Sequence, residues 1–418
     1  MGLLHYTCPP VIGGVETVLW EQGSRLARRG YPITVLAGRG GPLPSPAHDQ
    51  SQDDLSAPVR LALIPELDSR HPRVVEVRAR LDEGERPPDF DSLRDEIGVR
   101  LRPALAELDL LIVHNALSLH FNLALTAALW ELAEQGSTRL INWCHDLSWA
   151  NPLYQPLMRE ADPWSLLRRA HPRVTTVCVS EQRLGEWRML TGIRDAGSVI
   201  PNGIDVNALI RTGAHTRTLI ERLGLEGVDA ILLAPVRITR RKNLEWALQA
   251  AAGVRASGRS VRLIVTGPPG PHNPRSLEYV DELRRRRSAA GLEQEVHFLF
   301  EGAPAAADAA YPVDQATLAD LYMLSDVVVL PSSSEGFGLP LAEAALVRAP
   351  VVCTDIPAFR ELGSDGVRYV PLDAGPAGFS RAVLDALDEP KTRLRRRLRT
   401  ELSWDRIIDT RLVPLLNQ

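Results

Sequence analysis

The chain has 418 residues, more than one ordinary domain holds, so two or three domains are expected. Hydrophobic residues make up 44% and charged residues 24%, as in a soluble globular protein, and a net charge of -4 gives no general attraction for nucleic acid. The four cysteines are scattered without a C-x-x-C pair, which indicates reduced intracellular thiols and argues against a zinc site. We expect no signal peptide, no membrane-spanning segment and a cytoplasmic location.

The first half of the chain alternates short apolar runs with amphipathic stretches. Residues 15–29 repeat apolar side chains with helical spacing, and Gly30 stands where a helix C-cap belongs. The polar stretch 41–58 is expected to be a surface loop. Strands that alternate with helices indicate a parallel sheet covered on both faces. The expected strands are 3–7, 31–36, 59–64, 110–113, 140–143 and 175–179.

The same alternation restarts after residues 201–203, so we predict two α/β domains with a boundary near residue 205. Residues 268–276 and 303–315 are expected to be exposed loops, and the closing segment 403–416 is amphipathic. The expected strands of the second domain are 230–236, 261–266, 296–300, 327–330, 351–353 and 368–370.

The sharpest local pattern is the segment 332–344, which follows the strand expected at 327–330. Pro340 fits the first turn of a helix that runs to about residue 348. Gly336 and Gly338 would let the backbone approach a ligand closely, and the free N–H groups of the helix start would suit a phosphate.

Two glutamates lie in this segment. Glu335 falls in the loop at the carboxyl end of the strand, where ligands bind in open α/β sheets. Glu343 lies one turn into the helix and could reach the hydroxyls of a ribose. From spacing alone, a glycine-bearing turn with two solvated glutamates is an equally good interpretation.

Arg237 and Lys242 follow the strand expected at 230–236, ahead of a helix that Asn243 could cap. A diphosphate in a water-excluded cleft needs its charge neutralised, which Arg does through its bidentate fork and Lys as a point charge. The alternative is that these are ordinary solvated loop charges.

Four segments, in chain order, resemble the motifs of family 4 glycosyltransferases. Residues 335–343 resemble the donor-site signature, two glutamates separated by seven residues around G-F-G-L-P. Residues 199–205 resemble the interdomain linker, and Arg237 with 241–243 resembles the phosphate-binding strand end. Residues 13–16, Gly-Gly-Val-Glu, resemble the N-terminal glycine loop. Each match is weak alone, but together and in this order they are specific.

The resemblance implies a GT-B fold of two facing Rossmann-like domains. Residues 1–205 would form the acceptor side and 206–400 the donor side, with a helix at 401–418 packing back on the first domain. The implied reaction moves a hexose from a nucleotide-diphosphate sugar (UDP-, GDP- or ADP-hexose) to an unknown acceptor hydroxyl, with retention, as an α-glycoside. The implied donor-binding residues are Gly13, Gly14, Arg237, Lys242, Gly336, Phe337, Gly338, Leu339, Pro340 and Glu343.

The implied catalytic set is Glu335, His145, Arg237 and Lys242. Glu335 would hold hydroxyls of the donor sugar, and the two cations would stabilise the leaving diphosphate. His145 follows the strand expected at 140–143 and would face the transferred sugar, although a merely hydrogen-bonded strand-end histidine has the same pattern.

Further residues could line the acceptor side. His114 also ends an expected strand and could face the acceptor, while His120 carries a weaker signal. Aromatic faces suit the C–H surfaces of sugars, although buried aromatics are more often core. The aromatic residues proposed for an acceptor wall are Trp143, Trp149, Trp164 and Tyr154.

We expect neither a metal nor a cofactor. The two cations make a metal unnecessary in the family, and the one D-x-D spacing noted, Asp89 to Asp91, lies in the first domain. The arginine runs 284–287 and 393–399 leave peripheral membrane contact open but not favoured, because most such runs are solvated helix faces. Two alternatives remain: a nucleotide-sugar epimerase or hydrolase of the same fold, and a non-catalytic nucleotide-sugar-binding subunit.

Overall fold

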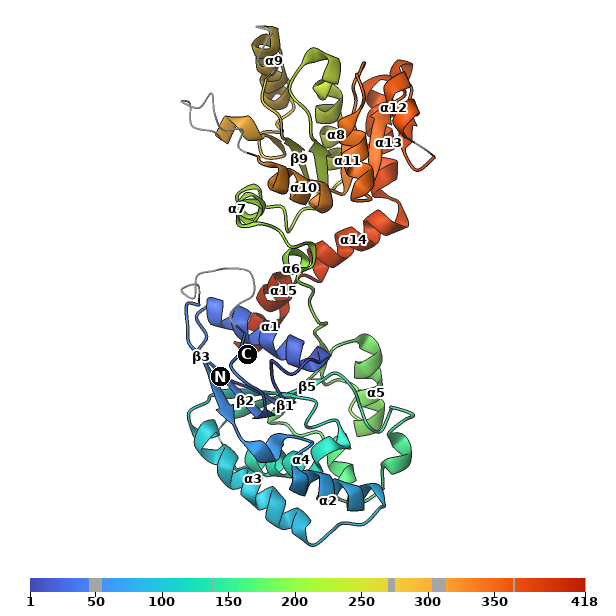
Figure 1. The fold of residues 1–418 in the computed structure, drawn as a ribbon. Helices are drawn as coiled ribbons and strands as arrows, with labels where there is room; N and C mark the ends of the chain where they lie inside the picture. The colour runs from blue at the N-terminus through green and yellow to red at the C-terminus, as the bar shows by residue number, and fades with distance from the viewer. Residues whose placement is uncertain (45–54, 137, 270–274, 303–312, 364, 418) are drawn as a thin grey trace. The chain divides into compact units, whose positions relative to one another are not determined.

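The computed structural model describes residues 1–418 except 45–54, 137, 270–274, 303–312, 364 and 418. The chain forms two compact units (Figure 1). Unit 1 contains Met1–Gly203 together with Trp404–Gln418, and unit 2 contains Ile204–Ser403. The chain therefore leaves unit 1 once and returns to it for its last 15 residues.

Unit 1 is built on a seven-stranded parallel sheet in the order β3-β2-β1-β4-β5-β6-β7. The first six strands of the sequence prediction are all present, and only the two-residue β7 was missed, because two residues show no periodicity. The sheet order reverses direction between β1 and β4, which makes this pair a topological switch point. The strands are β1 (Gly2–Thr7), β2 (Ile33–Arg39), β3 (Val59–Leu63), β4 (Leu110–His114), β5 (Arg139–Cys144), β6 (Val174–Cys178) and β7 (Ser198–Val199).

Helices cover this sheet and bury apolar faces against it. The helix α4 has ten buried residues, and the side chain of Asn122 caps it by accepting from the Leu125 N–H at 3.1 Å. After α1, Gly30 takes a φ of +88°, the left-handed conformation expected for a residue that stops a helix. The helices of the first 203 residues are α1 (Gly14–Arg28), α2 (Pro72–Asp82), α3 (Asp89–Ala106), α4 (Leu123–Gln135) and α5 (Glu181–Thr191).

Unit 2 repeats the design with a six-stranded parallel sheet in the order β10-β9-β8-β11-β12-β13, so β8 and β11 form its switch point. All six strands were predicted. They are β8 (Ala230–Ala234), β9 (Val261–Val265), β10 (Val296–Phe298), β11 (Val327–Leu330), β12 (Val351–Thr354) and β13 (Arg368–Val370). The helices are α6 (Val206–Ile210), α7 (Ala214–Leu223), α8 (Leu244–Ala256), α9 (Arg275–Ala289), α10 (Gln315–Leu324), α11 (Leu339–Leu346), α12 (Pro357–Leu362), α13 (Gly375–Leu387) and α14 (Pro390–Glu401).

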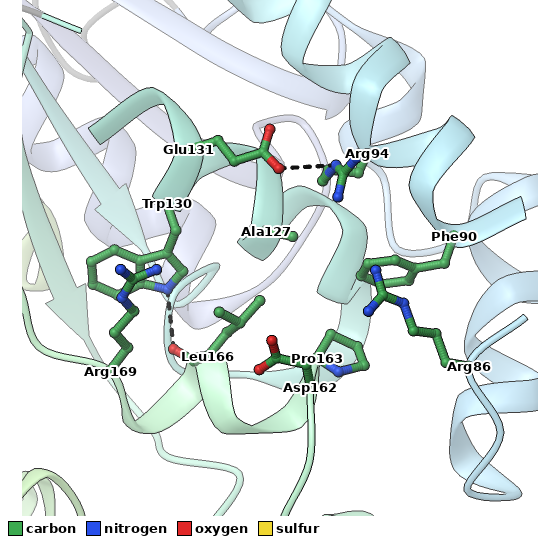
Figure 2. A pocket seen from close by; sticks show the side chains of 10 residues that line it. All are labelled: Arg86, Phe90, Arg94, Ala127, Trp130, Glu131, Asp162, Pro163, Leu166 and Arg169. Atoms are coloured by element: carbon green, nitrogen blue, oxygen red, sulfur yellow. Dashed lines mark hydrogen bonds and ion pairs between the residues drawn. The ribbon is translucent and has the colours of Figure 1, made fainter. Parts of the chain in front are cut away.

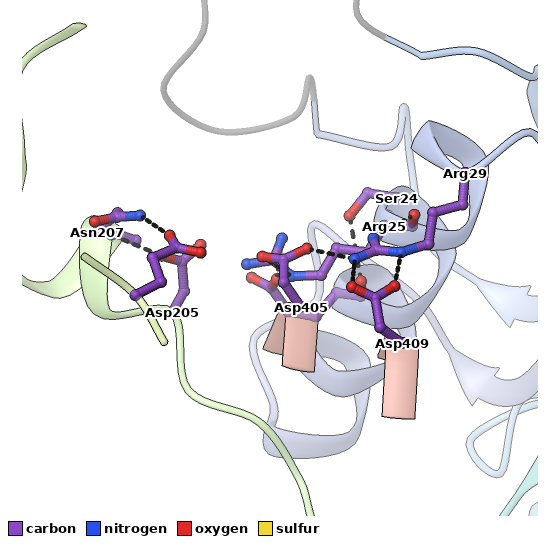
Figure 3. Close-up of polar contacts among 10 residues, drawn as sticks. Ser24, Arg25, Arg29, Asp205, Asn207, Asp405 and Asp409 are labelled. Carbon is purple, nitrogen blue, oxygen red and sulfur yellow. Dashed lines mark hydrogen bonds and ion pairs between the residues drawn. The ribbon is translucent and has the colours of Figure 1, made fainter. Parts of the chain in front are cut away.

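The C-terminal segment packs on unit 1. It comprises α15 (Trp404–Ile407), a wider helical turn at 408–412 and α16 (Val413–Leu416). Trp404 is 4% exposed and lies against Gly203, where a side chain would strike its ring. Arg29, which directly follows α1, pairs with Asp405 at 3.0 Å and with Asp409 at 2.5 Å (Figure 3). Burial of the tryptophan and this ion-pair fork fix the returning helix.

The two arginine runs have partners within unit 2. In α14, Arg399 is buried and donates to Asp326 at 2.7 Å and to two backbone carbonyls, while Arg395 donates to the Ser325 carbonyl. In α9, Arg284 and Arg287 both pair with Glu301. These side chains hold the unit together, which weighs against reading the runs as membrane-docking surfaces.

Among the residues that the structure describes, no helix is long and apolar enough to cross a membrane. Parts of three expected loops, 45–54, 270–274 and 303–312, lie outside the described residues.

Candidate active site

In unit 2 the predicted donor residues gather where two neighbouring strands end. The loop after β8 carries Arg237 and Lys242, and the loop after β11 carries Glu335. Because β8 and β11 pair in parallel at the switch point, their carboxyl ends open on the same edge of the sheet. The structure therefore brings these three predicted residues to one edge of the sheet.

Glu335 is the centre of a buried polar cluster. Its side chain is 6% exposed, and Oε1 accepts from the Lys242 ammonium and, at 2.8 Å, from the Ser332 hydroxyl. Oε2 accepts from Arg241 at 3.1 Å. The structure thus pairs Lys242 directly with Glu335, a contact that the sequence prediction did not include, and it adds Arg241 and Ser332 to the site.

Lys242 is nearly enclosed, with a side chain 9% exposed. Burial lowers the pKa of its ammonium, while Glu335 beside it acts in the opposite direction. An ammonium has three donors, so Lys242, which bonds to Glu335 here, can direct donors toward a phosphate oxygen when a ligand binds.

Arg237 is an exposed cation on the same loop as Lys242. No ion pair or hydrogen bond of its guanidinium is found in the part of the chain that has been described. Its backbone is fixed, because Gly267 packs so closely that a Cβ would lie 2.6 Å from the Arg237 Cα. An anchored backbone with a solvated guanidinium suits capture of an anion.

The helix start after the glutamate loop is shaped for close approach. Gly338 has a φ of +95°, which favours glycine, and Gly336 faces open space. Pro340 has no N–H and the Leu341 N–H donates to Gly338 O at 2.9 Å, so fewer amides remain for a phosphate than an open helix start offers. Phe337 and Leu339 are about 60% exposed.

Glu343 is held by a residue that the sequence analysis missed. Its Oε2 accepts from the Tyr322 hydroxyl at 2.6 Å, and Tyr322 is 2% exposed. A buried tyrosine that fixes a carboxylate makes Glu343 a rigid acceptor. No sequence signal marked Tyr322, because it lies in α10, far from the motif.

The prediction that the Asn243 side chain caps α8 is wrong. Asn243 adopts a left-handed φ of +46°, and its amide donates to the Pro331 carbonyl at 2.9 Å instead of capping α8. The N–H of Leu244 is satisfied by the Tyr279 hydroxyl at 2.8 Å. Asn243 therefore ties the β8 loop to the end of β11.

In unit 1, histidines lie in β1, at the end of β4 and directly after β5, on and beside the switch point. His5 of β1 lies within 3.0 Å of the His114 carbonyl, and the rings of His114 and His145 are joined by a 3.1 Å bond between Nδ1 and Nε2. The backbone after β5 is fixed because the Asn115 side chain accepts from the His145 N–H at 2.9 Å. His114 and His145 were predicted, whereas His5 and Asn115 were not.

These histidines are neutral at physiological pH. Burial lowers the pKa of His145 to about 3 and that of His114 well below its usual value. An imidazole of this kind can donate or accept a hydrogen bond, but it does not carry charge. His145 is thus equipped to orient a hydroxyl rather than to balance a phosphate.

The glycine loop at residues 13–16 lies beside these histidines. Gly13 is extended and precedes α1, and a Cβ there would meet the carboxylate of Glu16. Glu16 accepts from the Thr7 hydroxyl at the end of β1 at 2.5 Å, and Gly14 faces open space. Gly13 and Gly14 therefore lie near the carboxyl end of β1.

The predicted aromatic acceptor wall is largely wrong. Trp143 and Trp164 are 0% and 3% exposed and belong to the core. Trp149 is covered by the Arg168 guanidinium, 3.9 Å from its ring centroid, and Tyr154 packs edge-on against Phe121. His120 bonds to the Ser148 hydroxyl and is likewise part of the packing.

A separate hollow of about 140 Å³ lies among α3, α4 and residues 162–169 (Figure 2). Its three arginines are each paired with a carboxylate: Arg86 with Asp91, Arg94 with Glu131, and Arg169 with Glu134. It shares no residue with the predicted site. Asp91 of the D-x-D spacing belongs to this ion-pair network.

Over the described stretches of the chain, no group of three or more His, Cys, Asp or Glu side chains is placed to hold a metal ion.

Both sheets contain the 3-2-1-4-5-6 strand order of the doubly wound nucleotide-binding fold, so the chain has the two Rossmann-like units that the GT-B class combines. The model of Glycosyltransferase Family 4 matches residues 12–208, and that of Glycosyl transferases group 1 matches residues 216–401. The chain belongs to the GT-B glycosyltransferases of the family 4 type.

Curated relatives agree at low identity. Mannosylglucosylglycerate synthase of Petrotoga mobilis is 23% identical over 68% of this chain and 66% of its own length. The D-inositol 3-phosphate glycosyltransferase of Thermomonospora curvata is 30% identical over 51% of this chain and 50% of its own length. That of Gordonia bronchialis is 25% identical over 96% of this chain and 83% of its own length. The chain spans about half to two thirds of the length of the first such relatives. A solved complex of HepE of Anabaena with UDP is 18% identical, covers both chains fully and has a TM-score of 0.35.

Proposed function

We propose that this protein is a retaining hexosyltransferase that moves a hexose from a nucleotide-diphosphate sugar to an acceptor hydroxyl as an α-glycoside. The observation that carries the proposal is the cluster of Lys242, Glu335 and Arg241 at the switch point of unit 2, with the exposed Arg237 on the same loop as the two cations. Cations and a fixed carboxylate at such an edge suit a ligand that joins a diphosphate to a polyhydroxyl group.

In this proposal Arg237 and Lys242 bind the diphosphate and stabilise it as it leaves. Because these side chains already supply positive charge, the reaction is proposed to need no metal and no cofactor. Glu335 accepts hydrogen bonds from the transferred sugar, and Glu343 accepts from the ribose. Contacts to the sugar that strengthen as its bond breaks lower the barrier, whereas contacts to the ribose bind substrate and transition state about equally.

The acceptor side is assigned to unit 1. His145 is neutral and partly exposed, so it can hydrogen-bond a substrate hydroxyl without attracting a phosphate. Relatives whose names include inositol phosphate and glucosylglycerate suggest polyols and sugar acids as the first acceptors to try.

The test is a panel of UDP-glucose, GDP-mannose and ADP-glucose, each incubated with and without polyol acceptors, with release of nucleoside diphosphate as the readout. Acceptor-dependent release and an α-linked product support the proposal. Release without any acceptor identifies a hydrolase, and isomerised donor identifies an epimerase. Stabilisation by a diphosphate without turnover of any donor identifies a binding subunit; at a hundred times its dissociation constant a ligand stabilises by about 2.7 kcal/mol.

A further inference from the structure

We infer that Arg241 is a positioning residue that holds Glu335 in place when Lys242 turns toward the donor diphosphate. This inference rests on the proposed function of the same site. It assigns a separate task to the arginine next to the phosphate-binding lysine.

The first argument is that Arg241 joins two loops. Its guanidinium donates to the Ser334 carbonyl at 3.0 Å and to Glu335 Oε2 at 3.1 Å. Its own carbonyl accepts from the Ser333 N–H at 2.7 Å and from the Ser333 hydroxyl at 3.2 Å. Four bonds from one residue therefore tie the loop after β8 to the loop that carries Glu335.

The second argument concerns the charge of Glu335. The carboxylate is 6% exposed, and a buried charge without a partner is costly. If Lys242 directs its donors toward a diphosphate, Oε1 keeps the Ser332 hydroxyl and Oε2 keeps Arg241. Arg241 is then the remaining cation on the carboxylate, so Glu335 keeps a charged partner and stays oriented during sugar transfer.

The third argument is a contrast with the residue before it. Arg240 has the same charge, but it pairs with Glu282 at 2.9 Å and lies over the Tyr279 ring at 5.1 Å. Its side chain is 60% exposed, compared with 50% for Arg241. Arg240 therefore serves as a matched control for loss of one arginine charge on the same loop.

The kinetic experiment compares Arg241→Ala, Arg241→Lys and Arg240→Ala with the parent, using whichever of UDP-glucose, GDP-mannose and ADP-glucose the parent turns over. Loss of a bond to a charged group should lower kcat of Arg241→Ala by about tenfold to a hundredfold, with donor KM changed by less than about threefold. Arg241→Lys should recover part of kcat, since a lysine restores the charge but not the fork. Arg240→Ala should stay within about twofold of the parent. If Arg241→Ala instead raises KM and keeps kcat, Arg241 is a phosphate ligand and the inference is wrong.

A second measurement does not depend on turnover. Amide hydrogen exchange of the peptide covering residues 331–339 should speed up in Arg241→Ala and stay unchanged in Arg240→Ala, because only the first variant releases the glutamate loop. Calorimetry with UDP, GDP and ADP should give Arg241→Ala the affinity of the parent. Equal exchange in both variants overturns the inference. A parent that turns over none of the three sugars refutes the proposed function, and the exchange result alone then decides the role of Arg241.

Discussion

The two sheets of this molecule have their switch points at equivalent places in the strand order, but the side chains there differ in charge. In unit 1 the edge between β1 and β4 is lined by His5, His114 and His145, which burial keeps neutral. In unit 2 the edge between β8 and β11 holds ionised groups, with Lys242 and Arg241 on the carboxylate of Glu335.

Under the proposed function, this difference lets one fold support two kinds of binding. Neutral imidazoles on the first sheet favour hydroxyl groups, whose hydrogen bonds need no counter-charge. Cations on the second sheet favour a diphosphate, and the neighbouring carboxylate keeps them neutralised before a ligand arrives. The predictions below break or sharpen that contrast, beginning with the largest expected effect.

Removing the buried cation should have the largest effect. Lys242→Ala should weaken binding of a nucleoside diphosphate by roughly 10-fold to 150-fold, because a charge-assisted bond to an ionised group is lost. Arg237→Ala should act in the same direction, and Arg240→Ala is the control. Calorimetry with UDP, GDP and ADP measures the change. If Lys242→Ala and Arg237→Ala both bind like the parent, the donor site has been placed wrongly.

The two glutamates should separate binding from turnover. Glu335→Gln should chiefly reduce kcat, and it should leave diphosphate affinity equal to or tighter than that of the parent, because the Lys242 ammonium loses its competing carboxylate. Glu343→Gln should instead weaken diphosphate binding and raise donor KM, since ribose contacts serve substrate and product alike. Steady-state kinetics and calorimetry on both variants decide this. The opposite pattern would mean that the roles of the two carboxylates are reversed.

The buried histidines of unit 1 should make the stability of the protein fall in acid. In the unfolded chain a histidine takes up a proton near pH 6.5. In the folded protein the pKa of His145 is about 3 and that of His120 about 4, so the native state resists protonation. Their contribution is fully present above about pH 6.5 and is lost as the pH falls toward 4, by up to about 1.4 kcal/mol per pH unit for each histidine.

Urea unfolding of the parent and of His145→Asn between pH 7 and pH 4.5 measures this loss. The variant should show the shallower pH dependence. Identical slopes in the two proteins would show that His145 is protonated as readily in the folded state as in the unfolded one.

The ion pairs of the returning helix should contribute only a little to the free energy of unfolding. Arg29→Ala should lower the free energy of unfolding by only about 0.2–1 kcal/mol, because Asp405 and Asp409 are 45% and 56% exposed and water screens such pairs. The loss should shrink further at high salt. Thermal unfolding at two salt concentrations checks it, and a loss above about 3 kcal/mol would show that these contacts carry the packing of Trp404.

Chelation of divalent metal ions should have no effect on transfer activity. If the cations of unit 2 do the work that a divalent ion does elsewhere, transfer activity should survive excess EDTA. Loss of activity that is restored by magnesium or manganese would contradict the metal-free mechanism.

The local sequence alone determined the sheets and the position of the predicted donor residues in the chain. Runs such as 230–234 and 327–330 are continuous apolar strands, and parallel order forces the polar residues after them onto one edge. For that reason Arg237, Lys242 and Glu335 could be placed at the carboxyl ends of their strands from periodicity. The same logic placed His114 and His145 at strand ends.

Only the tertiary structure decided which of these groups are partners. Lys242 and Glu335 are 93 residues apart in the chain, and their contact depends on the pairing of β8 with β11. Tyr322 reaches Glu343 from another helix, and Asn243 bonds to Pro331 rather than capping its own helix. Burial of Trp143 in the core was equally invisible, because an aromatic residue at a strand end suits both a sugar surface and a core. Sequence periodicity reports which face of an element is apolar, whereas side-chain pairing depends on distances set by the packed sheet.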